Sequence, residues 1–294
     1  MKQSHNRIKR IGLIGNSGKA ACAAVVSKAA TLIRASKRQV FSDSDTAELA
    51  RLGGKNFPDA ASLAAAVDLI LVFGGDGTML RVAREIAGSQ TPMLGINIGG
   101  LGFLTAVSSR DLPGALKQIW KGAFKFESRS LLEAHARAQG KLIQQTALND
   151  LVISRGIASR LIELHVTVND QPVTRYRCDG LIVSSPTGST AYSLAAGGSV
   201  VFPTAEVLQI TPICPHTLSN RSLILPMTSV ICVKVVNPTP VTMLSADGQV
   251  VTELTADDHV TVRRSDRTVQ LMHLEGSSFF DTLRAKLHWR GANL

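Results

Sequence analysis

The sequence has 294 residues, of which 45% are hydrophobic and 18% charged, which is the balance of an ordinary globular protein. No apolar stretch approaches the ~18 residues that a membrane-spanning helix needs, so we expect no membrane insertion and a cytoplasmic location. A formal net charge of +10 attracts polyanions such as nucleoside phosphates, but aromatic residues make up only 4% of the chain, which argues against a nucleic-acid-binding platform.

The cysteines and histidines give no sign of a metal site. The four cysteines are scattered without a paired spacing, and the seven histidines form no ligand pair at helical or zinc-finger spacing. Structural zinc sites and disulfide frameworks require such spacing. We therefore expect no metal ion held by dedicated protein ligands, and any metal is expected to arrive with a nucleotide.

The first 125 residues alternate between apolar runs typical of strands and helical patterns. The expected strands are Ile11–Ile14, Gln39–Phe41, Leu69–Phe73 and Pro92–Ile96, and the expected helices are Ala20–Arg34, Ala60–Val67, Met79–Ala87 and Asp111–Lys121. This alternation predicts an open α/β sheet. Ligands of such sheets bind beyond the carboxyl ends of the strands, where 74–78 and 97–103 fall, so these two segments are expected to share one cleft.

From about Phe126 the pattern changes to the period of two that strands show. The expected strands are Ile162–Val168, Val173–Arg177, Leu181–Val183, Ser229–Val236, Val241–Ala246, His259–Arg263 and Thr268–His273, with Phe279–His288 as a final helix. We therefore predict an α/β domain over 1–125 and a β-rich domain over 126–275. The C-terminal helix, within 276–294, is expected to pack back on the first domain.

Gly74-Gly75-Asp76-Gly77-Thr78 joins a buried strand pattern to the helical pattern that follows it. Glycines at this place let the backbone approach a ligand closely, and the N-terminus of a helix favours phosphate. A carboxylate weakens phosphate binding, so Asp76 indicates another task, either holding a metal ion or accepting a proton from an attacking hydroxyl. Taken alone, the same five residues are explained about as well by a tight turn.

Gly15-Asn16-Ser17-Gly18-Lys19-Ala20 also follows a strand and opens a helix, as a P-loop does. The P-loop pattern requires glycine at the position of Leu13, and serine or threonine at the position of Ala20 to bind the metal ion. Neither requirement is met. This segment is therefore not expected to form a standard nucleoside-triphosphatase loop.

The segment from Asp179 to Tyr192 combines a short apolar strand with a run of hydroxyls, one glycine and one tyrosine. Those groups suit recognition of a sugar, phosphates and a flat base at close range. A Ser/Thr-rich turn is the plainer alternative, but a turn requires neither the preceding acid nor the following tyrosine.

Together these motifs resemble the bacterial NAD kinases. The matching motifs are Gly74–Thr78, Leu101–Thr105, Asn149-Asp150, Asp179–Tyr192 and Pro215–Ser219, in this order and over nearly the whole chain. Diacylglycerol, sphingosine and phosphofructokinase relatives share the first motif, whereas the segment from Asp179 is highly specific. The resemblance implies a kinase that transfers the γ-phosphoryl group of ATP to the 2′-hydroxyl of the adenosine ribose of NAD, giving NADP.

The resemblance also implies partners and residue roles. It implies a divalent metal ion such as Mg²⁺ with ATP, and a homodimer or homotetramer; whether polyphosphate can replace ATP stays open at this point. Asp76 is the expected catalytic base, and Gly74, Gly75, Gly77 and Thr78 form the expected phosphate loop. The expected NAD contacts are Asp76, Gly77, Asn149, Asp150, Arg160, Arg177, Asp179, Thr190, Ala191, Tyr192, Ser193, Leu194, Ala195 and Gln249.

Four positions depart from the family pattern. Asp150 stands where glutamate is usual, Ala195 where many members have serine, Arg160 where some have histidine, and Ile98 where some have arginine. Two rival functions stay open at this point. A lipid kinase would not need the segment after Ser184, and a nucleotide-binding regulator without catalysis would not need Asp76.

Overall fold

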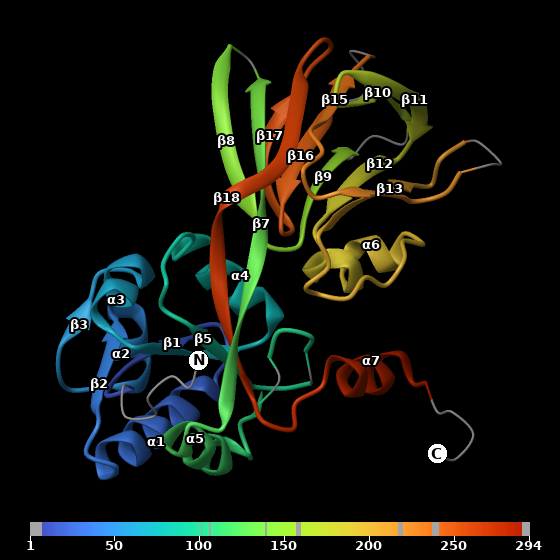
Figure 1. Cartoon of the computed structure of the whole chain (residues 1–294). Coiled ribbons are helices and arrows are strands. Elements are labelled where there is room, and N and C mark those ends of the chain that lie inside the picture. Colours follow the sequence, from blue (N-terminus) through green and yellow to red (C-terminus); the bar gives the residue numbers. More distant parts are fainter. Residues whose placement is uncertain are drawn as a thin grey trace. The chain divides into compact units, whose positions relative to one another are not determined.

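The computed structural model describes residues 8–100, 102–105, 107–138, 140–156, 160–216, 220–236 and 241–289 (Figure 1). It contains two compact units, Met1–Ser128 with Val269–Leu294, and Arg129–Thr268, which we call unit 1 and unit 2. Two long strands, β7 (Phe124–Ala138) and β18 (His259–Leu274), run through both units. The domain boundaries near 125 and 275 stay a prediction. In the described ranges no helix is long and apolar enough to cross a membrane.

Unit 1 is built on a parallel sheet with the strand order β3-β2-β1-β4-β5. Its strands are β1 (Arg10–Gly15), β2 (Gln39–Asp43), β3 (Asn56–Phe57), β4 (Leu69–Gly74), β5 (Met93–Asn97) and β6 (Val107–Ser108). Its helices are α1 (Cys22–Ala35), α2 (Ser44–Ala50), α3 (Ala60–Ala66), α4 (Asp76–Glu85), α5 (Leu112–Lys121) and α7 (Phe279–Leu287). Strand β4 is buried along its whole length, as its continuous apolar sequence requires.

Helices cover both faces of this sheet. On one face α1 and α5 pack on Leu71 and Phe73 of β4, with Ile33 and Ile119 in the same core (Figure 1). On the other face α3 and α4 lie so close that glycines are needed in the strands. A Cβ on Gly12 would meet the Leu63 side chain at 3.1 Å, and one on Gly95 would meet the Met79 sulfur at 3.0 Å.

Unit 2 is antiparallel and almost entirely β. One sheet has the order β14-β13-β12-β9-β16-β17, and a second set of strands has the order β11-β10-β15-β18. The elements are β8 (Lys141–Ala147), β9 (Asp150–Arg155), β10 (Ile162–Val168), β11 (Gln171–Cys178), β12 (Gly180–Ser184), the 3-10 helix η1 (Thr187–Thr190), α6 (Tyr192–Ala195), β13 (Val207–Ile213), β14 (Leu223–Pro226), β15 (Ile231–Val235), β16 (Thr242–Ala246) and β17 (Gln249–Leu254). Alternate residues of both sets, such as Leu181 and Leu164, form one apolar core.

The predicted fold class is confirmed: an α/β unit, an antiparallel β unit and a C-terminal helix. Two details of the prediction were wrong. The expected strands His259–Arg263 and Thr268–His273 are one continuous strand, β18, and α4 begins at Asp76 rather than at Met79. The short helix α2 was missed. Among the described residues of α7 only Leu283 is buried.

Candidate functional site

The loop after β4 is shaped by its glycines. Gly75 caps α4 in an extended conformation and offers no side chain to the amides of the first turn. A Cβ on Gly74 would lie 2.2 Å from the Thr78 hydroxyl oxygen, so only glycine fits there. The Asn16 side-chain amide donates to the same hydroxyl at 2.9 Å. The helix N-terminus therefore presents backbone amides and a partial positive charge, which suits phosphate.

The Asp76 carboxylate points into the segment that follows β5. Its Oδ2 accepts one hydrogen bond, from the Phe103 amide at 2.7 Å. Its Oδ1 accepts three, all at 3.1 Å, from the amides of Leu104 and Thr105 and from the Thr105 hydroxyl. The structure thus brings together 74–78 and 97–105, and the Ile98 amide also donates to the Gly74 carbonyl at 2.9 Å. Leu101 lies outside the described residues.

A second layer of contacts holds Thr105. The buried Asn97 side-chain amide donates to the Thr105 hydroxyl at 2.9 Å and to the Gly100 carbonyl at 2.6 Å. A Cβ on Gly102 would lie 2.0 Å from Oδ1 of Asp76, so the backbone can pass this carboxylate only as glycine. Asn97 and Thr105 lie in segments that the sequence analysis named, but it gave neither residue a role; the structure shows that they fix the side chain expected to carry the chemistry.

In unit 2 the structure gathers three segments that are far apart in sequence. The Asp247 carboxylate accepts hydrogen bonds from the amides of Leu148, Asn149 and Asp150 at 3.0, 2.8 and 3.3 Å. The Ser185 amide donates to the Asn149 carbonyl at 2.9 Å. These bonds bring together Asn149, Asp150, the start of the segment 184–190 and the turn that leads to Gln249. Gln249 itself is exposed.

The carboxyl group of Asp150 is buried beside that of Asp247. Burial, and next the Asp247 charge, raises the pKa of Asp150 to about 7. Near neutral pH this carboxyl group exchanges between a hydrogen-bond donor and a pure acceptor. The glutamate expected from the family would reach further by one methylene, so the aspartate keeps its carboxyl group closer to the backbone.

Asp179 and Arg177 lie next to the start of β12. Arg155 Nε donates to Asp179 Oδ1 at 2.6 Å, an ion pair that sequence reasoning missed. Arg177 is exposed on β11, and its carbonyl accepts from the His216 amide at 2.8 Å. Arg160 is also exposed. Of the Pro215–Ser219 motif, the last three residues lie outside the described ranges.

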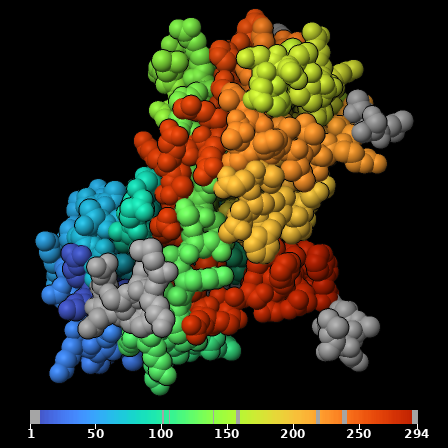
Figure 2. Space-filling model, in the orientation of Figure 1, coloured from blue at the N-terminus to red at the C-terminus, as the bar shows by residue number. Residues whose placement is uncertain are grey.

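The predicted residues of η1 and α6 divide between the surface and the interior. Ser193 is buried and its hydroxyl bonds to the Thr211 hydroxyl at 2.9 Å, whereas Tyr192 is 47% exposed. The remaining predicted residues here, Thr190, Ala191, Leu194 and Ala195, are all at least partly exposed. Figure 2 shows this yellow segment at the surface of unit 2. Gly188 is required because its Cβ would lie 2.1 Å from the Asn149 carbonyl oxygen.

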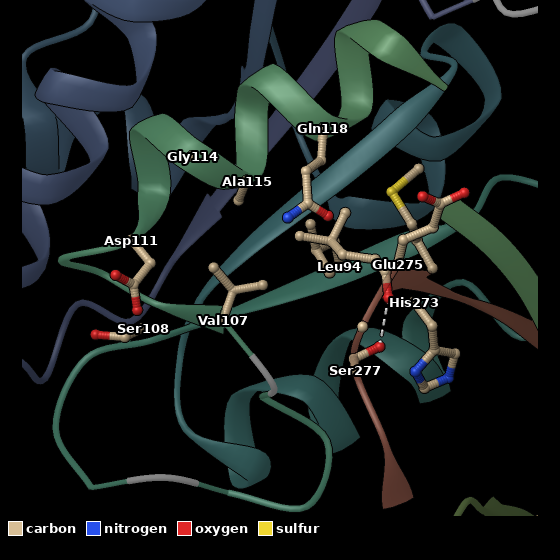
Figure 3. Close-up of a pocket in the computed structure, with 13 residues that line it drawn as sticks. Leu94, Val107, Ser108, Asp111, Gly114, Ala115, Gln118, His273, Glu275 and Ser277 are labelled. Atoms are coloured by element: carbon tan, nitrogen blue, oxygen red, sulfur yellow. Dashed lines mark hydrogen bonds between the residues drawn. The ribbon is translucent and has the colours of Figure 1, made fainter. Parts of the chain in front are cut away.

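Unit 1 also contains a cavity of about 280 Å³ between α5 and the end of β18 (Figure 3). It is lined by Leu94, Val107, Ser108, Asp111, Gly114, Ala115, Gln118, Met272, His273, Leu274, Glu275, Gly276 and Ser277. None of the residues predicted from the motifs lines it. The Ser277 hydroxyl donates to the Leu274 carbonyl at 2.6 Å and closes the turn at its edge.

The described residues do not form a cage for a metal ion. They contain no group of three or more histidine, cysteine, aspartate or glutamate side chains placed to hold one. The Asp76 carboxylate already accepts four hydrogen bonds. Mg²⁺ that arrives on a nucleotide takes most of its ligands from phosphates and water, and its arrival in this way stays a prediction.

Comparisons with known proteins agree with the motifs. The family model of the ATP-NAD kinase N-terminal domain matches residues 11–124, and that of the C-terminal domain matches residues 148–274. A NAD kinase of Burkholderia orbicola is 38% identical over 97% of this chain and 95% of its own length. A NAD kinase of Syntrophotalea carbinolica is 42% identical over 79% of this chain and 81% of its own.

Solved structures show the same fold. Yeast NADH kinase complexed with NADH is 25% identical, with a TM-score of 0.88, and the match covers 98% of this chain and 90% of that one. An NAD kinase from Archaeoglobus fulgidus in complex with ATP is also 25% identical, with a TM-score of 0.75, over 96% of this chain and all of that one. The chain belongs to the NAD kinase family, whose reaction is the phosphorylation of NAD to NADP.

Proposed function

We propose that the protein transfers the γ-phosphoryl group of ATP to the 2′-hydroxyl of the adenosine ribose of NAD, with Asp76 as the base. The observation that carries this proposal is that the two oxygens of the Asp76 carboxylate accept different numbers of hydrogen bonds. Oδ1 accepts three hydrogen bonds, whereas Oδ2 accepts one, from Phe103. Because a carboxylate oxygen accepts about two hydrogen bonds along its lone pairs, Oδ2 is the oxygen with room for a substrate hydroxyl.

Phosphoryl transfer requires mainly that this loop align the reacting groups and help to neutralise charge on the phosphate. A secondary ribose hydroxyl is a poor nucleophile at neutral pH, and a carboxylate within hydrogen-bond reach takes its proton as the new bond forms. The amides at the start of α4 would face the phosphate being transferred. Mg²⁺ bound to the donor would neutralise developing charge on the phosphate oxygens.

Unit 2 is proposed to provide most of the contacts with NAD. Asn149 and Asp150 would bind the hydroxyls of a ribose. Asp179 would contact the nicotinamide half of NAD, and the exposed part of η1 and α6 would contact its adenosine. The further proposed contacts are Gly77, Arg160, Arg177, Thr190, Ala191, Tyr192, Ser193, Leu194, Ala195 and Gln249. Supporting this, Asn149, Asp150 and the approach to Gln249 meet around Asp247. The buried Ser193 hydroxyl bonds to the Thr211 hydroxyl and would also position α6.

The remaining parts of the proposal concern partners. The two related structures above are complexes with NADH and with ATP, which supports NAD and ATP as the substrates of this protein, with polyphosphate as a second donor to test. We keep a homodimer or homotetramer and a cytoplasmic location as proposals, and light scattering of the purified protein and cell fractionation are their tests.

The test of the function follows the position of the new phosphate. Purified protein is incubated with ATP, Mg²⁺ and either NAD or NAD whose adenosine ribose lacks the 2′-hydroxyl, and NADP is measured with an NADP-specific dehydrogenase. We expect NADP to form from NAD, and we expect no phosphorylated product from the 2′-deoxy analogue. Phosphorylation of the 2′-deoxy analogue, or of diacylglycerol in place of NAD, would contradict the proposal.

A further inference from the structure

Lys19 belongs to the segment after β1 that resembles a P-loop without completing its pattern, and the structure places it against the loop that contains Asp76. Its ammonium donates to the Ile98 carbonyl at 2.8 Å. A Cβ on Gly75 would lie 3.6 Å from Lys19 Nζ, and one on Gly99 would lie 3.7 Å from it. The ammonium therefore lies beside the open faces of two glycines, one from each of the segments 74–78 and 97–105.

The position of Lys19 is fixed by Asn16. The Asn16 amide donates to the Phe73 carbonyl at 3.0 Å, and the Asn16 side chain donates to the Thr78 hydroxyl at 2.9 Å. The same side chain accepts from the Gly18 amide at 2.9 Å, and the Asn16 carbonyl accepts from the Lys19 amide at 3.2 Å. These bonds tie the segment 16–19 to the end of β4 and to the first turn of α4.

The Lys19 ammonium has more N–H donors than its one hydrogen bond to Ile98 uses. A lysine ammonium has three N–H donors, and the Ile98 carbonyl takes one of them. Within the part of the chain that the structure describes, no carboxylate forms an ion pair with Lys19. The acid of the loop, Asp76, directs its carboxylate at 103–105 instead. Among the described residues, two donors and the charge of Lys19 thus remain without a partner beside the N-terminus of α4, which has no side-chain cap.

We propose that Lys19 binds the polyphosphate chain of the phosphoryl donor at the loop Gly74–Thr78. This proposal rests on the proposed function, because it assigns the cation that holds the donor there. Residues 75 and 99 are glycines and place no side chain beside the ammonium, and its contact with a phosphate oxygen would be a charge-assisted hydrogen bond. Lys19 thereby does what a P-loop lysine does, in a segment that keeps Gly18 but has Leu13 and Ala20 where the P-loop pattern requires glycine and a hydroxyl residue.

A purely structural role is the competing explanation, in which Lys19 only tethers the Ile98 carbonyl. Two substitutions separate the roles. Lys19→Met keeps much of the side chain's volume but removes both the charge and the donor, whereas Lys19→Gln removes the charge and keeps an amide donor for Ile98. Lys28→Met is the matched control, because Lys28 is an exposed lysine of the neighbouring helix α1 and loses the same charge.

The experiment measures binding of inorganic tripolyphosphate with Mg²⁺ by calorimetry, alongside the Kd for NAD and the melting temperature of each variant. We expect the tripolyphosphate Kd to rise about tenfold or more in both Lys19 variants, as loss of a charged hydrogen bond predicts, with the NAD Kd unchanged. Wild-type tripolyphosphate affinity in Lys19→Gln would overturn the proposal, as would an equal rise in Lys28→Met. If Lys19→Met does not fold, Lys19→Gln decides.

Failure of this inference is distinguishable from failure of the proposed function. If the wild-type protein forms NADP and the Lys19→Gln variant binds tripolyphosphate with wild-type affinity, only the proposed role of Lys19 is refuted. If the wild-type protein forms no NADP, the proposed function is refuted, whatever the Lys19 variants bind.

Discussion

Thr105 holds Oδ1 of Asp76 from two sides, because both its backbone amide and its hydroxyl lie 3.1 Å from that oxygen. The hydroxyl donates to Asp76 while it accepts from the Asn97 side chain at 2.9 Å, so its hydrogen atom is oriented. A carboxylate held in this way cannot rotate freely about its terminal bond. Oδ2 is therefore kept facing the same direction, which is what a base needs before its substrate arrives.

Replacement of the Thr105 hydroxyl tests this orientation. Thr105→Val keeps the shape of the side chain but removes the donor to Oδ1, so we expect kcat to fall about tenfold with the KM for NAD within about twofold of wild type. Thr105→Ser keeps the hydroxyl and is expected to restore most of kcat. Steady-state kinetics measure both, and a valine variant as fast as the serine variant would show that the hydroxyl does not matter.

A methyl group at residue 102 tests the close approach of the backbone to Asp76. Its Cβ would lie 2.0 Å from Oδ1, so Gly102→Ala must move either the carboxylate or the segment 103–105. We expect a loss of kcat of about tenfold or more, since a displacement of about 1 Å at a reacting group is that costly. Gly100→Ala is the control, because no atom lies near a Cβ there. Equal activity of the two variants would contradict the geometry.

The buried carboxyl group of Asp150 predicts a pH dependence of stability. Its pKa is about 7 in the folded protein against 3.8 for an exposed aspartate. The folded state therefore binds more protons between these values, and this group's contribution to the free energy of unfolding falls as pH rises through that range. Asp150→Asn removes the titration. We expect the asparagine variant to gain stability relative to wild type between pH 5 and pH 8.

Urea denaturation of wild type and Asp150→Asn at the two pH values measures this difference. Asp45→Asn, which changes an exposed carboxylate at the start of α2, serves as the control. A stability difference between wild type and Asp150→Asn that is the same at both pH values would mean that Asp150 does not titrate in this range.

Much of the fold follows from local sequence patterns. The run Leu69–Phe73 is apolar at every position, which only a strand covered on both faces accommodates, and β4 is buried throughout. Boundaries were less accurate, because α4 begins inside the glycine-rich loop, where composition indicates a turn. The strands His259–Arg263 and Thr268–His273 were expected to be separate, but the polar residues between them lie along one continuous strand, β18.

The contacts of the candidate site could not be predicted in the same way. Motifs identify Asp76 and Asp150 as unusual acids, but their partners lie 27 to 29 residues away for Asp76 and 97 residues away for Asp150. No local periodicity encodes such pairs. Gly102 gives a partial signal, because a glycine inside an otherwise apolar segment often marks a close approach of the backbone.

The most direct test of the account is the turnover of Asp76→Asn with saturating NAD, ATP and Mg²⁺, measured together with its Kd for NAD and its melting temperature. The amide keeps one oxygen for the amides of 104 and 105 but removes the proton acceptor. We predict that kcat falls by about 100-fold or more, the usual contribution of a positioned base, while NAD still binds within about threefold of wild type. NADP formation at the wild-type rate by this variant would contradict the assignment of Asp76 as the base.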